Sequence, residues 1–521
     1  MYNIAKLSIC AAALFACAAS YAEIKMPRLF SNSMVLQRDA EVNVWGTADA
    51  GAKVEVEFDG QKVAAKAAAD GSWALKLKPM KESGMLRKMT VSENGRPSKV
   101  INDVLVGEVW IVGGQSNMAY PLRLIDGAKE IIAAANNSLI RYFDQGSNPE
   151  MKSTQGLGKD PETDTLKGTS WLVCSPKNAE HSFRAVPYIF ARDLAQKLNM
   201  PVGLIYTAIP GTPMVAWIPR DEYDSNPAFA DVKKSYETRL KNYNYQKALA
   251  AYEETVRTYP ERVEKAKKEG KRPPESWTIA ENMRPWKDSP DKWSTPVMLY
   301  NIRINPVKNF TARGVIWYQG ESDSASPATF GKKLEGFIKI WRKVFNNADM
   351  PFIMVQLPSY KSQTWPEIRQ VQQDIADLMK NVFVATSIDT GTIDDVHPKE
   401  KLPVGERMAR AALAGVYGFK DVSAGGPVLK SVRYDGKSAN IEFDVRGDKL
   451  VCKGEPRGFE VLSGGKWVEA KTKVAHNSIS LEAADSGDVS GVRYLYKPWA
   501  KPDVCIYNDD GLPAHPFINV K

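Results

Sequence analysis

Residues 109–118 place a serine where many hydrolases carry their nucleophile. An apolar run ends in two glycines, and Ser116 follows between the amide side chains of Gln115 and Asn117. Glycines permit a sharp turn, and a serine on such a turn at the end of a strand exposes its hydroxyl above the sheet. Because a serine hydroxyl attacks an ester poorly by itself, it needs an imidazole base and fixed N–H donors for the oxyanion. The segment therefore predicts a nucleophile turn.

The choice of base is narrow because the chain contains four histidines. His181 lies in a predicted loop before a helix, and His476 and His515 fall in a C-terminal region with a β-strand pattern. His397 follows the last predicted strand of the central region, with two acidic residues close before it. We therefore expect His397 to be the base.

Residues 104–418 alternate between strand and helix patterns. Short apolar runs without polar alternation are typical of parallel strands that are covered on both faces. These runs lie at residues 109–112, 202–206, 315–318, 352–356 and 382–386. Between them, apolar residues recur at helical spacing, as they do at 334–345 and 368–379. The pattern predicts an α/β fold with a doubly wound parallel sheet.

Four unusual segments directly follow predicted strands. They are residues 113–118, 207–213, 317–323 and 394–398. In open α/β sheets, ligands bind beyond the carboxyl ends of the strands. We therefore expect these segments to meet and to supply the nucleophile, the oxyanion donors and the base of acyl-ester hydrolysis.

Two β-rich regions flank the central one. Residues 23–103 contain short alternating strands with Asp59-Gly60 as a hairpin signal, which predicts a small β-sandwich. Residues 419–521 return to the same rhythm and predict a second β-domain. Residues 221–290 are rich in Lys, Glu, Tyr and Arg and lack a strand pattern, so they predict a charged helical insertion in the central domain.

Residues 1–22 have the pattern of a signal peptide. Lys6 is their single charge, an apolar run follows, and the segment ends in a small-x-small cleavage site. The run is too short to span a bilayer comfortably, so we expect an exported protein that is periplasmic or extracellular. The alternative is a lipid anchor at Cys17, to which the bulky Phe15 is poorly suited.

Composition excludes several classes of function. The formal net charge is +9, and it falls by one to +8 if Lys6 leaves with the signal peptide. The charges are spread along the chain, and the interleaved basic and aromatic pattern of nucleic-acid binding is absent from the sequence. Outside the signal peptide, Cys174, Cys452 and Cys505 allow one disulfide but no disulfide framework. The sequence lacks the zinc motifs Cys-x-x-Cys and His-Glu-x-x-His.

The ordered blocks resemble those of the SGNH-hydrolase superfamily and, within it, the sialate O-acetylesterase family of carbohydrate acetylesterases. The matching blocks are Met34-Val-Leu-Gln-Arg38, Val104-Leu-Val-Gly-Glu-Val-Trp110, Gly114-Gln-Ser-Asn-Met118, Val202-Gly-Leu-Ile205, Gly211-Thr-Pro213, Gly314-Val-Ile-Trp-Tyr-Gln-Gly-Glu-Ser322, Val396-His-Pro398 and Tyr507-Asn-Asp-Asp-Gly-Leu-Pro513. The resemblance implies a flavodoxin-like SGNH sheet, Ser116 as nucleophile and His397 as base. It also implies an oxyanion hole made by the N–H groups of Ser116 and Gly211 and by the side-chain amide of Gln319, and no cofactor.

The acid behind the histidine stays open in the sequence. Asp394 has the usual superfamily spacing, three residues before His397, and is our first choice. Asp395 has the spacing of closer relatives, and Glu321 occupies the Gln-Gly-Glu segment that related acetylesterases use. The resemblance also allows a serine–histidine dyad oriented by a backbone carbonyl. The chain departs from the family at Asp323, where asparagine is frequent.

The resemblance implies O-acetylated sialic acid as the substrate. Arg369 matches a recurring family arginine that can bind a sugar carboxylate through two hydrogen bonds. Arg184 is a second candidate for that contact, and Trp365 is a candidate for stacking on a sugar ring. Acetylated plant polysaccharides such as xylan or pectin are the alternative substrates. An alternative of another class is a non-catalytic glycan-binding protein.

Overall fold

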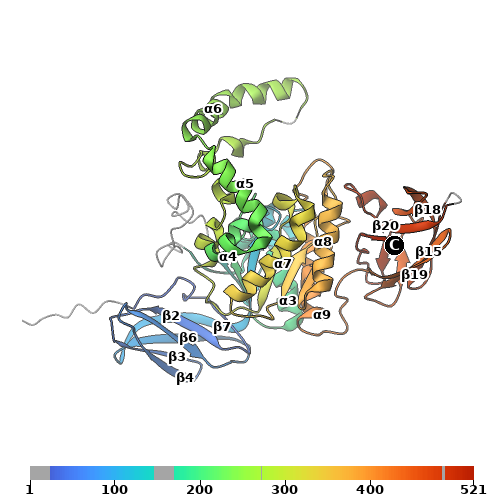
Figure 1. The fold of residues 1–521 in the computed structure, drawn as a ribbon. Helices are drawn as coiled ribbons and strands as arrows, with labels where there is room; N and C mark the ends of the chain where they lie inside the picture. The colour runs from blue at the N-terminus through green and yellow to red at the C-terminus, as the bar shows by residue number, and fades with distance from the viewer. Residues whose placement is uncertain (1–23, 146–168, 272, 484–486) are drawn as a thin grey trace, which may run out of the picture.

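A mainly parallel β-sheet lies at the centre of the molecule, between two β-rich regions (Figure 1). The computed structural model describes residues 24–145, 169–271, 273–483 and 487–521. The predicted signal peptide and the candidate anchor Cys17 lie outside these ranges. Within them, no helix combines the length and the apolar character needed to span a membrane.

The central sheet has the strand order β13-β12-β11-β7-β10-β8-β9. Its strands are β7 (Arg96–Gly114), β8 (Ile140–Asp144), β9 (Ser170–Val173), β10 (Val202–Tyr206), β11 (Gly314–Tyr318), β12 (Phe352–Val355) and β13 (Val382–Ala385). All pairings are parallel except that of β8 with β9. The predicted α/β fold with a largely parallel central sheet is therefore confirmed.

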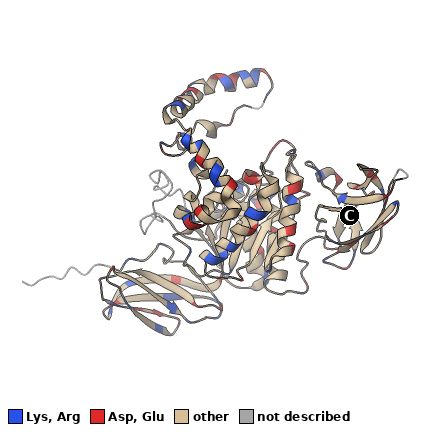
Figure 2. Ribbon diagram, viewed as in Figure 1, with Lys and Arg blue, Asp and Glu red and all other residues tan. Residues whose placement is uncertain are grey.

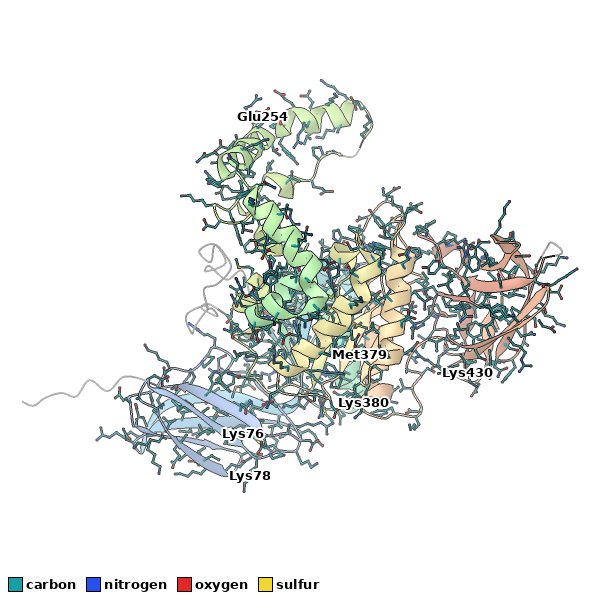
Figure 3. All side chains as sticks on the ribbon, in the orientation of Figure 1. Lys76, Lys78, Glu254, Met379, Lys380 and Lys430 are labelled. Carbon is teal, nitrogen blue, oxygen red and sulfur yellow. The ribbon has the colours of Figure 1, made fainter. Side chains whose placement is uncertain are left out.

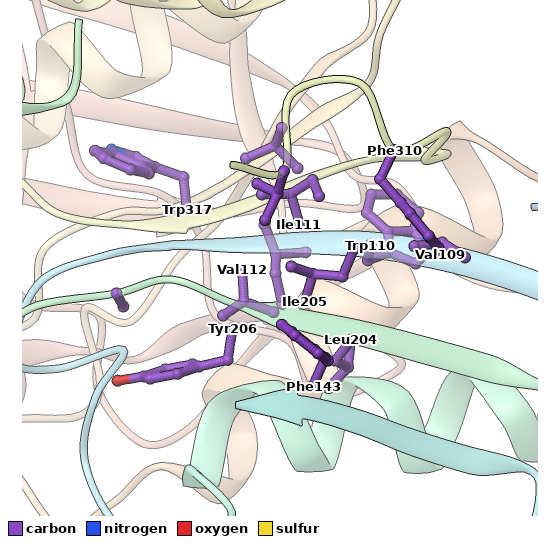
Figure 4. Packing of buried hydrophobic residues seen from close by; sticks show 14 of the residues in the cluster. Val109, Trp110, Ile111, Val112, Phe143, Leu204, Ile205, Tyr206, Phe310 and Trp317 are labelled. Atoms are coloured by element: carbon purple, nitrogen blue, oxygen red, sulfur yellow. The ribbon is translucent and has the colours of Figure 1, made fainter. Parts of the chain in front are cut away.

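Apolar side chains on both faces explain why these segments form buried strands. Every residue of β10, β11 and β12 is buried. Figure 4 shows Ile111 and Val112 of β7 packed beside Leu204 and Ile205 of β10. Removing such side chains from water is the main favourable contribution to the fold, at about 25 cal/mol per Å² of apolar surface.

Amphipathic helices supply the covering layers. Helix α3 packs on α9, and α7 packs on α8. The helices are α1 (Ala128–Ala133), α2 (Pro176–His181), α3 (Ala185–Leu198), α7 (Pro327–Val344), α8 (Trp365–Leu378) and α9 (Leu402–Gly415). The two helical patterns expected from the sequence correspond to α7 and α8.

The N-terminal region contains β1 to β6 and the first part of β7. The strands are β1 (Val35–Gln37), β2 (Val42–Thr47), β3 (Lys53–Phe58), β4 (Gln61–Lys66), β5 (Ser72–Leu77) and β6 (Ser83–Glu93). The predicted hairpin at Asp59-Gly60 joins β3 to β4, and both residues have positive φ. Strand β7 runs without a break through the boundary expected between residues 103 and 104, because it pairs first with β6 and then with β10 and β11.

The charged insertion is helical and projects from the central region (Figures 1 and 2). It contains α4 (Arg220–Ser225), α5 (Ala230–Lys241) and α6 (Tyr245–Lys268), followed by short 3₁₀ turns. No residue of α6 is buried. Glu254, labelled in Figure 3, lies on this projecting helix, far from the central sheet.

The C-terminal β-domain has a seven-stranded antiparallel sheet with the order β14-β15-β19-β18-β17-β20-β22, and a separate β16-β21 pair. Its strands are β14 (Val428–Asp435), β15 (Ser438–Asp444), β16 (Leu450–Cys452), β17 (Phe459–Ser463), β18 (Lys466–Val474), β19 (Ser478–Ala483), β20 (Val489–Tyr494), β21 (Ile506–Asn508) and β22 (Phe517–Val520). Buried His515 joins it to α8, with Nδ1 2.6 Å from Gln373 Oε1.

Candidate active site

The Ser116 turn is pressed against the end of β11. Gly114 has φ +128°, and a Cβ there would lie 2.3 Å from the carbonyl oxygen of Tyr318, so only glycine fits without strain. The Gln115 N–H donates to the same Tyr318 oxygen at 2.9 Å. Ser116 follows in a turn and is half-buried.

The two amides beside Ser116 connect three segments that are distant in the sequence. Gln115 Oε1 accepts a hydrogen bond from the Ser322 N–H at 3.1 Å. Asn117 Nδ2 donates to Glu321 Oε1 at 2.6 Å and to the carbonyl oxygen of Val396 at 3.1 Å. Because Asn117 follows Ser116 and Val396 precedes the predicted base, these bonds bring the nucleophile turn beside the histidine loop.

The structure separates the two aspartates that precede His397. Asp395 Oδ1 accepts a hydrogen bond from the His397 backbone N–H at 2.9 Å and lies 3.9 Å from His397 Nδ1. The Asp394 side chain is 79% exposed and binds Lys361 Nζ at 3.0 Å. Asp395, and not our first choice Asp394, therefore lies beside the imidazole. The distance of 3.9 Å exceeds a hydrogen bond, so a small movement is needed before Asp395 can orient the ring.

Glu321, the third candidate acid, lies under the nucleophile turn. Its Oε1 atom accepts the bond from Asn117, and its Oε2 atom is buried with no hydrogen-bond partner among the described residues. Burial raises the pKa of Glu321, while the Asn117 bond and the charge of Lys401 act in the opposite direction. The bond from Asn117 thus joins Glu321 to the serine side of the site.

A lysine that the sequence did not single out also lies here. Lys401 is fully buried, and its Nζ atom donates to Asn117 Oδ1 at 2.8 Å and to the Pro398 carbonyl oxygen at 2.5 Å. Burial lowers the pKa of Lys401 to about 7, although Glu321 and other carboxylates oppose that shift. The stretch Lys399-Glu-Lys401 has the composition of a solvated loop, so no local signal distinguished Lys401 from Lys399.

The expected oxyanion donors are partly in place. The Ile209 N–H donates to the carbonyl oxygen of Gly114 at 3.1 Å, which holds the 207–213 loop beside the Ser116 turn. Gly211 in that loop is exposed and has φ +71°, a conformation that favours glycine. Its carbonyl oxygen accepts a bond from Ser294 Oγ at 2.9 Å.

Gln319, the expected side-chain oxyanion donor, is already engaged. Its Nε2 atom donates to Asp323 Oδ2 at 2.6 Å and to the Thr212 carbonyl oxygen at 3.3 Å. Its Oε1 atom is buried without a hydrogen-bond partner in the described part of the chain. Both amide hydrogens therefore point to protein acceptors, and Gln319 must turn before it can meet an oxyanion. Burial raises the pKa of Asp323, and the N–H of Met214 opposes this by donating to the same oxygen.

The three substrate-binding candidates lie in different surroundings. Arg369 on α8 is fully buried, and its Nη2 atom donates to the carbonyl oxygens of Lys497 at 2.5 Å and Pro498 at 3.4 Å. Burial lowers the pKa of Arg369 to about 9. Its Nη2 atom thus contacts the C-terminal segment, while its Nε and Nη1 atoms are buried without a hydrogen-bond partner among the described residues.

Trp365 and Arg184 differ in their access to the site. Trp365 is buried and packs on the ring of Tyr360 at 4.8 Å between centroids, which leaves little of its surface for a sugar. Arg184 is only partly buried and precedes α3, with its guanidinium 5.5 Å from the centre of the Tyr206 ring at the carboxyl end of β10. A β-bridge joins Arg184 to Pro121, five residues after Ser116.

Comparisons with known proteins point to carbohydrate esterases. Residues 282–414 match the family model described as carbohydrate esterase, sialic acid-specific acetylesterase. The matched segment contains strands β11, β12 and β13 and the His397 loop. The sialate O-acetylesterase of Rattus norvegicus is 27% identical over 545 residues, which cover 93% of this chain and 92% of the rat protein.

Two further relatives match over a similar share of the chain. The human sialate O-acetylesterase is 27% identical over 94% of this chain and 91% of its own length. The crystal structure of a carbohydrate acetylesterase from Xanthomonas citri has a TM-score of 0.76 at 26% identity, and the match covers 95% of this chain and 99% of that one. The protein is therefore a carbohydrate esterase, and the glycan-binding alternative without catalysis is not supported.

Proposed function

We propose that this carbohydrate esterase removes O-acetyl groups from sialic acids through an acetyl-enzyme intermediate. The observation that carries the proposal is the pair of bonds from Asn117 to Glu321 and Val396, which brings the Ser116 turn beside the His397 loop. The names of the rat and human relatives support sialate as the substrate.

The proposed reaction has two halves. Ser116 Oγ attacks the acetyl carbonyl carbon while His397 accepts the hydroxyl proton. The tetrahedral intermediate collapses, the sugar oxygen leaves with the proton from His397, and the acetyl group stays on Ser116. Water then attacks the acetyl-enzyme with His397 as base, and acetate and free Ser116 are released.

Three groups are proposed to stabilise the charges of this reaction. Asp395 lies nearest to the imidazole among the candidate acids and would stabilise the imidazolium, with Asp394 and Glu321 as the alternatives. The N–H groups of Ser116 and Gly211 would bind the oxyanion. A preorganised donor of this kind is worth about 3 kcal/mol in the transition state.

Binding of a sialate carboxylate requires an accessible cationic side chain near the site. Arg369 binds two backbone carbonyls, whereas Arg184 lies partly exposed at the sheet edge near the Ser116 turn. We therefore propose Arg184 as the first candidate for the sialate carboxylate. Acetylated xylan or pectin remains the alternative substrate, because the same catalytic groups would serve it.

One experiment tests the activity and the substrate together. Acetate release is measured from O-acetylated sialosides, xylan and pectin with the wild-type enzyme and with Ser116→Ala. We expect release from sialosides by the wild type and none by the variant. Release from xylan or pectin but not from sialosides would overturn the sialate assignment, and full activity of Ser116→Ala would overturn the mechanism.

We also propose that the enzyme is exported, with residues 1–22 as its signal peptide and a lipid anchor at Cys17 as the alternative. The charge and apolar pattern of the segment supports export. Mass spectrometry of the mature protein after expression in a bacterium tests this. We expect an N-terminus at residue 23 in the periplasm or medium, and an unprocessed cytoplasmic protein would contradict the proposal.

A further inference from the structure

Lys401 is a buried lysine beside the site, and the mechanism above does not use it. It is the residue that precedes α9, and its side chain has 0% exposure. A buried amine is costly unless hydrogen bonds replace its contacts with water. Here the two acceptors are the Asn117 side chain and the Pro398 carbonyl oxygen, and both belong to residues adjacent in sequence to the proposed catalytic pair.

We propose that Lys401 is a positioning residue that holds the Ser116 turn and the His397 loop at their working distance. The proposal rests on the proposed function and deepens it. Lys401 binds the carbonyl after His397, at Pro398, and Asn117 binds the carbonyl before it, at Val396. Since Lys401 also binds Asn117, the base is held on both sides by groups fixed to the nucleophile turn.

The hydrogen bonds show why a donor is needed at this position. The Asn117 amide has two N–H groups, which bind Glu321 and Val396, and one oxygen, which accepts from Lys401. If the amide rotated by half a turn, its oxygen would face the carboxylate and the carbonyl, and its N–H groups would face the lysine donors. Lys401 therefore keeps Asn117 in the orientation that binds the histidine loop.

The surroundings of the Lys401 Nζ atom fit this role. The rings of Tyr120 and Tyr318 lie 5.1 Å and 5.9 Å from it, and aromatic faces attract a cation at such distances. Glu321, Asp395 and Glu400 also act on Lys401 by charge. A side chain of the same length without a donor would fill the space but would leave Asn117 Oδ1 and the following carbonyl without their bonds.

The test compares Lys401→Met, Asn117→Ala and the double variant on 4-nitrophenyl acetate. We expect Lys401→Met to lower kcat by about 10²-fold with little change in KM, because a small misplacement of catalytic groups has an effect of this size. Because Lys401 acts through Asn117, the double variant should be no more than about threefold slower than Asn117→Ala alone. Losses that multiply, or a Lys401→Met enzyme with wild-type kcat, would overturn the proposal.

Two further variants separate positioning from stability. Lys401→Gln keeps an N–H donor without the charge, and we expect it to recover at least about tenfold over Lys401→Met. Arg407→Met removes another buried cation from α9, one that binds Asp389 and not the site, and should keep wild-type kcat. Melting curves monitor folding.

If Lys401→Met does not fold, Lys401→Gln and Asn117→Ala decide the question. The role is supported if folded Lys401→Gln has a lower kcat than the wild type and if the same substitution does not lower kcat further in the Asn117→Ala enzyme. A further decrease in kcat in the Asn117→Ala enzyme overturns it. An Arg407→Met enzyme as slow as Lys401→Gln overturns it too. A wild-type enzyme that does not hydrolyse the ester, or an active Ser116→Ala, instead shows failure of the proposed function.

Discussion

The Ser116 turn and the His397 loop meet at one site but are held in different ways. The turn continues a central strand of the sheet, and its amides Gln115 and Asn117 are 3% and 0% exposed. In the loop, the side chains of His397 and Asp395 are 40% and 42% exposed. Backbone bonds to β11 fix the turn. The loop is joined to it by side chains, since Asn117 binds the Val396 carbonyl oxygen and Lys401, just after the loop, binds Asn117.

This difference concerns how firmly the fold holds each of the two proposed catalytic groups. A proposed nucleophile at the carboxyl end of a central strand has a fixed direction, because moving it would break buried backbone hydrogen bonds. A base on a partly exposed loop adjusts more easily, which suits a group that must face first the serine and then water. The loop therefore depends on a few side-chain contacts for its position.

The largest expected effect concerns the nucleophile. Ser116→Ala should lower kcat/KM on an aryl acetate on the order of 10⁵-fold, because the serine and its base act as a unit. Ser322→Ala, an exposed serine on the neighbouring segment, is the matched control and should keep wild-type activity. Equal activity of the two variants would show that Ser116 is not the nucleophile, and the comparison between the turn and the loop would then lose its basis.

The next effect separates the acids of the loop. Asp395→Asn should lower kcat by about 10²-fold or more, because the carboxylate near Nδ1 would no longer stabilise the imidazolium. Asp394→Asn changes an exposed group that binds Lys361 and should change kcat less than about twofold, as surface ion pairs contribute little. The reverse order in the measured rates would restore Asp394 as the acid.

Hydrogen exchange should report the different restraint of the two regions. The Gln115 N–H binds the Tyr318 oxygen at the end of β11, and the Ala119 N–H binds the Gln115 oxygen within the turn. We therefore expect these two amides to exchange at least about tenfold more slowly than the amides of residues 394–397. Mass spectrometry of the native enzyme after peptic digestion measures both segments in one sample. Equal protection would mean that the loop is held as firmly as the turn.

The smallest expected effect is a pH dependence at Asp323, beside the turn. Burial raises the pKa of Asp323 above its ordinary value of 3.8, so the unfolded chain ionises first and wild-type stability falls as pH rises through this window. Asp323→Asn removes the ionisable group. The free energy of unfolding of the variant, relative to that of the wild type, should therefore rise with pH, by at most about 1.4 kcal/mol per pH unit. Denaturant unfolding at several pH values measures the slope, and a flat difference would contradict the raised pKa.

Much of the fold and part of the site could be predicted because their signals are local. The apolar runs of β10 and β11 predict buried strands wherever they stand in the chain. Gly114 predicts the turn at Ser116 without any knowledge of the tertiary structure. Helices α7 and α8 follow from their periodicity in the same way. Strands β8 and β9 were not predicted, and β7 crosses the expected domain boundary.

By itself, the sequence determined the strands of the sheet and the glycine turn at Ser116, and it led to the proposal of His397 as base, because the periodicity of apolar residues, a turn glycine and a scarce residue type can all be read locally. Only the tertiary structure decided that Asp395 lies nearer to the imidazole than Asp394, that Gln319 binds Asp323, and that Arg369 is buried on the C-terminal segment. It also brought Lys401 to Asn117, across 284 positions of the chain. Such pairs depend on how folded segments meet, and no spacing along the chain records that.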